Sequence, residues 1–120
     1  MIGFTSAQRY YLAVMAADMR KSYDGLSGLV RNGLGRDPLS GEVFIFLNRR
    51  RTMIKILVWD RSGFVLYGKR LERGTFELPK SSTAGQSLAL EWEQLVMILE
   101  GVRLSSVKHR KRYSRPAKAA

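Results

Sequence analysis

Three apolar runs separated by very short connections constrain the fold more than any other feature of the sequence. Val43–Leu47 and Met53–Trp59 have the composition of strands, and the basic connection Arg49–Thr52 lies between them. Asp60–Gly63 opens with Asp and closes with Gly, as tight turns do, and leads into a third strand over Phe64–Lys69. Because no connection is long enough for a crossover helix, we predict an antiparallel meander.

The segments around this meander predict further strands and two helices. Arg9–Ala16 is short, apolar and aromatic, which is typical of a strand, and Thr75–Leu78 is a candidate short strand. Apolar residues recur at helical spacing from Asp18, a candidate N-cap, to Asn32, with Gly33 as the C-cap. A second helix, capped by Ser87 and ending at Gly101, is predicted from the apolar stripe Leu88, Trp92, Leu95, Val96 and Leu99.

These elements predict the α+β class: one small domain over residues 1–104, with a meander of about four to five strands packed against two helices. No periodicity continues beyond Ser105, so residues 105–120 are expected to form a basic, flexible C-terminal arm. The N-terminus lacks the features of a signal peptide, and no apolar run is long enough for a membrane helix. We therefore expect a cytoplasmic protein without membrane contact.

Positive charge is concentrated toward the C-terminal end of the chain. The 120-residue chain has a formal net charge of +11, and residues 101–120 hold 7 basic and no acidic side chains. Such clusters favour an anionic partner, because neutralised phosphates release condensed counterions. Nucleic acid is the first candidate partner, and the candidate contact residues in the arm are Lys108, Arg110, Lys111, Arg112 and Arg115. A tail that only keeps the protein soluble is the alternative.

Catalytic residue types are scarce. The chain has no cysteine, and its one histidine, His109, lies inside a run of basic residues, which excludes thiolate chemistry and a two-histidine metal site within one chain. Gly33 and Gly35 lack the third glycine of a dinucleotide loop. Asp18, Asp24 and Asp60 form a weak candidate carboxylate set, since caps and turns explain acids at these places. We expect a protein that is not an enzyme and needs no cofactor or metal.

The basic connection between the first two meander strands is the stronger candidate site. Arg49, Arg50 and Arg51 are adjacent like charges at a hairpin tip, and guanidinium groups bind phosphate in a bidentate manner. Lys55 and Lys69 on the adjoining strands, with Arg61 in the next turn, are expected to extend this surface across one sheet face. The meander aromatics Phe44, Phe46, Trp59 and Tyr67 raise the alternative of a base-stacking platform, although core packing is the simpler interpretation of each.

Three stretches carry a resemblance to a known family: residues 18–26, residues 37–79 and residues 92–101. The most specific part is the block FLNRRR at 46–51, followed by KILVWD at 55–60 and KRLERG at 69–74. The chain resembles the TnpB-type accessory proteins of IS66-class bacterial insertion sequences, which differ from the RNA-guided nucleases that share the TnpB name. Arg20, Lys21, Asn48 and Arg70 are among the polar positions that match the family.

The resemblance implies a small, non-catalytic protein that assists a separate DDE-type transposase. We expect it to bind transposon DNA through the basic hairpin and the C-terminal arm. The alternative is an adaptor that binds the transposase and attracts DNA only weakly. An RNA-binding role is compatible with the composition but has no motif in its favour.

Overall fold

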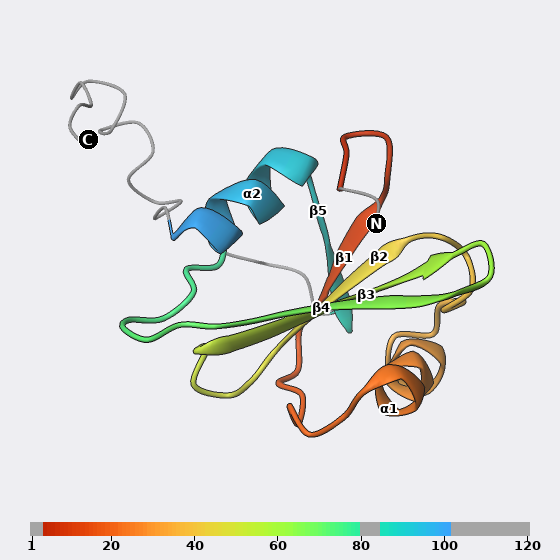
Figure 1. Cartoon of the computed structure of the whole chain (residues 1–120), viewed down its shortest axis with the longest axis horizontal. Coiled ribbons are helices and arrows are strands. Elements are labelled where there is room, and N and C mark those ends of the chain that lie inside the picture. Colours follow the sequence, from red (N-terminus) through yellow and green to blue (C-terminus); the bar gives the residue numbers. More distant parts are fainter. Residues whose placement is uncertain (1–3, 80–84, 102–120) are drawn as a thin grey trace.

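The computed structural model describes residues 4–79 and 85–101. In this part of the chain a five-stranded sheet lies between two helical layers (Figure 1). The strands are β1 (Tyr10–Ala13), β2 (Val43–Leu47), β3 (Met53–Asp60), β4 (Gly63–Arg70) and β5 (Ser87–Leu90). The helices are α1 (Tyr23–Gly28), the short π-helix η1 (Leu29–Gly33) that continues it, and α2 (Trp92–Glu100). The α+β class is confirmed.

The sheet is mixed, with strand order β4-β3-β2-β1-β5. β2, β3 and β4 form the predicted antiparallel meander. β1 instead pairs with β2 in parallel, and β5 pairs with β1 antiparallel. The parallel pair arises because α1 and η1 lie between β1 and β2, so the chain crosses over before β2 begins and the two strands run in the same direction.

Two cores occupy the two faces of the sheet. On the α2 face, Ile45, Ile54 and Ile56 pack with Leu95 and Ile98 of the helix. The other face buries the set Leu26, Val30, Phe44, Phe46 and Leu57 under α1 and η1. Every residue of β2 is buried, which explains why its sequence is continuously apolar rather than alternating.

The first helix is shorter than its apolar spacing predicts. It begins at Tyr23 after the N-cap Ser22, so the prediction that Asp18 caps it is wrong. Asp18 instead forms a turn in which its carboxylate accepts the Arg20 backbone N–H at 2.9 Å. An Asp side chain that bonds two residues ahead competes with helix formation, which is why the helix starts later.

The segment before α2 also differs from its prediction. Ser87–Leu90 is a strand, not the first turn of the helix, and the helix begins after Glu91, whose backbone N–H donates to Gln94 Oε1 at 2.8 Å. Leu88 fits the predicted helical stripe, but Leu88 and Leu90 together fit the two-residue period of a strand, and pairing with β1 selects the strand. Thr75–Leu78 forms no strand, so that prediction is wrong. The predicted arm, residues 105–120, lies outside the described residues.

Candidate nucleic-acid interface

The β2–β3 loop is built around Asn48. Its Oδ1 accepts the backbone N–H groups of Thr52 and Met53 at 2.9 and 3.0 Å, and its Nδ2 donates to Thr52 Oγ1 at 3.0 Å. The Arg51 N–H donates to the Asn48 carbonyl at 3.0 Å, which closes the turn. These bonds order the loop backbone. Asn48 therefore positions the neighbouring arginines and has its own polar atoms already engaged.

The three arginines of this loop, Arg49, Arg50 and Arg51, are all exposed. The ion pairs among the described residues join Arg20 to Asp18, Arg36 to Glu42 and Arg70 to Glu72, so none includes a loop arginine. Arg51 has a left-handed backbone with φ 60°. Three accessible guanidinium groups on an ordered tip are suited to anions.

The chain after β4 lies beside this loop. The Leu71 N–H donates to the Thr52 carbonyl at 2.8 Å, and the Phe76 N–H donates to the Arg51 carbonyl at 2.7 Å. Arg70 is the register partner of Met53, so it lies near the loop, where it forms an exposed ion pair of 3.4 Å with Glu72. In Figure 1 both loops extend to the left of the sheet.

The segment between β1 and α1 reaches the same end of the sheet. The Ala17 N–H donates to the carbonyl of Leu47, the last residue of β2, at 2.9 Å. Arg20 and Lys21 follow on this segment and are exposed. Hydrogen bonds from the Arg20 side chain and backbone lower the pKa of Asp18, and the same contact raises the pKa of Arg20. Arg20, Lys21 and Arg70 thus lie toward the same end of the sheet as the loop arginines, with Arg20 paired to Asp18 and Arg70 paired to Glu72.

Lys55 and Lys69 do not extend the basic surface across one sheet face, because the β3–β4 register puts them on opposite faces. Lys55 Nζ donates to the carbonyls of Met19 and Lys21 at 2.8 and 2.7 Å. Lys69 Nζ donates to the Leu99 carbonyl in the last turn of α2 at 2.7 Å. Both ammonium groups therefore connect the sheet to the segments that cover it.

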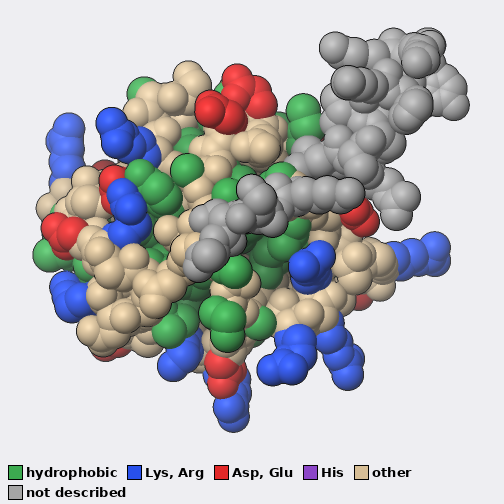
Figure 2. All heavy atoms as spheres, turned by 180° about the vertical axis from the view of Figure 1, so that it is seen from behind, with side chains coloured by type: hydrophobic (Ala, Val, Ile, Leu, Met, Phe, Trp, Pro, Cys, Tyr) green, Lys and Arg blue, Asp and Glu red, His purple; other side chains and the backbone are tan. Residues whose placement is uncertain are grey.

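Arg61 lies at the opposite end of the molecule from the other candidate residues. It occupies the β3–β4 turn with φ 59°, and β3 spans eight residues, or about 25 Å, between this turn and the β2–β3 loop. Arg9, which precedes β1, belongs to the same far end, because its carbonyl accepts the Val43 N–H at 2.8 Å. Figure 2 shows Lys and Arg side chains at both ends, with the loop end on the right.

The aromatic residues of the meander do not assemble a base-stacking platform. Phe44 and Phe46 are completely buried. Trp59 is half-buried and meets Phe64 edge to face, with ring centroids 5.1 Å apart. Tyr67 is exposed but lies on the other face of the sheet, where it contacts Phe4. Core packing, the simpler interpretation, is confirmed for the two phenylalanines.

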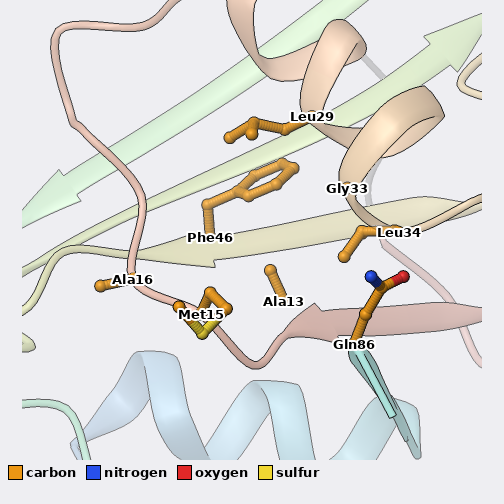
Figure 3. Close-up of a pocket in the computed structure, with 8 residues that line it drawn as sticks. All are labelled: Ala13, Met15, Ala16, Leu29, Gly33, Leu34, Phe46 and Gln86. Carbon is orange, nitrogen blue, oxygen red and sulfur yellow. The ribbon is translucent and has the colours of Figure 1, made fainter.

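Two cavities at the end of β1 have no counterpart in the sequence predictions. One, of about 260 Å³, lies between Met15, Leu29, Leu34 and Phe46 (Figure 3). The other, of about 350 Å³, is lined by apolar side chains and by Arg51. The sequence held one signal for this region. The apolar run Tyr10–Ala16 is longer than the four-residue strand β1, and Val14 and Met15, which follow the strand, are exposed.

The described ranges, 4–79 and 85–101, contain neither a metal-binding cluster nor a membrane-spanning helix. No three His, Cys, Asp or Glu residues there are grouped to hold a metal ion. No helix in these ranges combines the length and hydropathy of a membrane span.

Comparison with known proteins identifies the family. The family model described as IS66 Orf2-like protein matches residues 8–109. The chain is 33% identical to the uncharacterized protein y4jC of Sinorhizobium fredii over the full length of both chains. It is 34% identical to y4hO of the same organism over 78% of this chain and 80% of that protein. No solved structure matches significantly. The chain belongs to the IS66 Orf2-like family and is an accessory protein associated with transposition.

Proposed function

We propose that this protein binds transposon DNA without catalysing strand cleavage or joining. The loop arginines Arg49 and Arg50, with Arg20, Lys21 and Arg70 toward the same end of the sheet, contact phosphates on one side of the interface. The basic residues between Lys108 and Arg115 add further contacts. Phosphate contacts of this kind position a protein on a duplex and carry little sequence information.

The observation that carries the proposal is the ordered, uncompensated tip of the β2–β3 loop. Adjacent like charges repel, and here they are held together by the hydrogen bonds of Asn48 with no carboxylate paired to them in the described residues. An anion relieves this repulsion. Preordered donors also lose less conformational entropy on binding than mobile ones do.

The salt dependence of duplex binding tests the proposal. With about six phosphates contacted, log affinity should fall with log salt concentration at a slope near −5. Replacing Arg49 and Arg50 by Gln removes two of these contacts, so the slope should become shallower by about 2. Fluorescence anisotropy of a labelled duplex, titrated at several salt concentrations, measures both quantities.

The matched control replaces Arg9 and Arg61 by Gln, which makes the same charge change at the far end of the sheet. This control should leave the slope nearly unchanged. Equal effects of both pairs would show that only net charge matters, and no binding at low salt would refute the proposal. Strand cleavage by the purified protein would refute its non-catalytic part.

A further inference from the structure

An apolar surface at the end of β1 is exposed although the rest of that strand is largely covered. Val14 is 50% and Met15 is 76% exposed. The Val14 N–H still donates to the Gln86 carbonyl at 3.0 Å, so the backbone here continues the sheet and is held in place. We call Val14, Met15 and the two cavities beside them the β1-end surface. A contiguous exposed apolar patch, here two side chains beside two cavities, is typical of an interaction site.

The two cavities share the lining residue Ala13 and lie on either side of this segment. In the first, Figure 3 shows Met15 below β2 and Phe46, with Leu29 and Leu34 from the helical layer above. Gln86 is its only polar side chain among the described lining residues. This cavity offers no cation to a phosphate and is suited to an apolar side chain.

The second cavity combines apolar walls with one charge. Leu12, Val14, Leu78 and Leu88 line it together with Arg51. Among the described residues Arg51 has no carboxylate partner. Its left-handed backbone costs about 1–2 kcal/mol relative to glycine at that position, yet an arginine is present. Arg51 is exposed beside these apolar side chains, so a ligand that brings both a carboxylate and apolar groups would complement the surface.

We propose that the β1-end surface docks an acidic, leucine-type segment of a partner protein. Apolar side chains of this segment enter the two cavities, and its carboxylate pairs with Arg51. A second copy of this chain is a poor occupant, because a net charge of +11 opposes self-association. The proposal goes beyond DNA binding: it divides the loop, with Arg49 and Arg50 directed to DNA and Arg51 to a protein.

A defined peptide set tests this docking site. The probes are fluorescently labelled octapeptides. Each contains two leucines and one glutamate, the remaining positions are serine or glycine, and the set covers every order and spacing of the three residues. Fluorescence anisotropy with the full chain should show binding of some members. Their glutamine analogues should bind about tenfold more weakly, because the charge-assisted contact to Arg51 is lost.

Two variants and two matched controls locate the binding. Met15→Ser and Arg51→Gln should each weaken the best peptide about tenfold or more. The control Leu39→Ser changes another exposed apolar side chain, and the control Arg61→Gln changes another arginine with a left-handed backbone. Neither control should change the affinity for the peptide. The Met15→Ser variant should bind duplex DNA as tightly as the unchanged protein does. Peptide binding and DNA binding are therefore tested separately, and the failure of one is distinguishable from the failure of the other.

Four outcomes would overturn the proposal. The first is that no acidic peptide binds, and the second is that the control variants lose as much peptide affinity as Met15→Ser and Arg51→Gln. The third is that duplex DNA displaces the bound peptide. The fourth is that the protein self-associates in sedimentation and that Met15→Ser abolishes this self-association. The last outcome would assign the surface to a second copy of the chain.

Discussion

Single residues in this protein show how one side chain decides the shape of a whole loop. Asn48 orders the β2–β3 loop through three side-chain hydrogen bonds. Arg51, three residues later, accepts a left-handed backbone to complete the turn, and Arg61 does the same in the next turn. Left-handed backbone is easily adopted by glycine but strained for residues with a Cβ atom.

Replacing Arg51 by Gly should therefore stabilise the fold even as it removes a functional side chain. Relief of about 1–2 kcal/mol of backbone strain exceeds the entropic cost of glycine, about 0.5–1 kcal/mol, so the free energy of unfolding should rise by about 0.5–1 kcal/mol. Arg61→Gly should have the same effect. Arg50→Gly, at a position without positive φ, should lower stability. Urea denaturation measures all three, and destabilisation by Arg51→Gly would contradict the expectation.

At the scale of elements, two lysines connect the sheet to its two covering layers. Lys55 binds the segment that leads into α1, and Lys69 binds the last turn of α2. A cation at a helix C-terminus is favourable because that end carries unpaired carbonyls and a partial negative charge. These bonds assign both side chains a role in the fold.

Lys69→Met should loosen the end of α2. Loss of a charge-assisted hydrogen bond of this kind costs about 1.5 kcal/mol, so amide exchange in the last turn of α2 should accelerate by roughly tenfold. Arg73→Met, which removes an exposed positive charge four residues later in the chain, should leave that exchange unchanged. Hydrogen exchange followed by mass spectrometry makes the comparison, and unaltered exchange in Lys69→Met would show that the bond adds no stability.

For the whole molecule, one sheet supports two cores. Because all five residues of β2 are buried, the strand belongs to both cores, and neither can unfold without it. Trp59 and Trp92 report on opposite faces, since Trp59 contacts Phe64 of the α1-side core and Trp92 packs on the α2-side core. The described domain is therefore expected to unfold as one unit.

Single-tryptophan variants test this cooperativity. Trp59→Phe and Trp92→Phe should give coincident unfolding transitions by fluorescence and circular dichroism. Ile45→Val in one core and Phe44→Leu in the other should each lower the free energy of unfolding by about 1 kcal/mol, and each should shift both fluorescence transitions equally. If a mutation shifted only the tryptophan signal of its own face, the two cores would be independent.

Local patterns determined those parts of the protein that depend on neighbours in sequence. The apolar runs of β2 and β3, the short turn after Asp60 and the basic loop all follow from residues a few positions apart, and the meander is confirmed. The family resemblance, carried by contiguous motifs, is confirmed for the same reason.

Tertiary structure alone decided the features that depend on distant segments. Leu88 suits both a helix that contains Trp92 and a strand that contains Leu90, and only pairing with the edge of β1 selects the strand. Register placed Lys55 and Lys69 on opposite faces, since side chains alternate at each residue and a one-residue offset changes the face. The β1-end surface likewise arises only where β1, η1 and the β2–β3 loop meet, because exposure is a property of packing and not of composition.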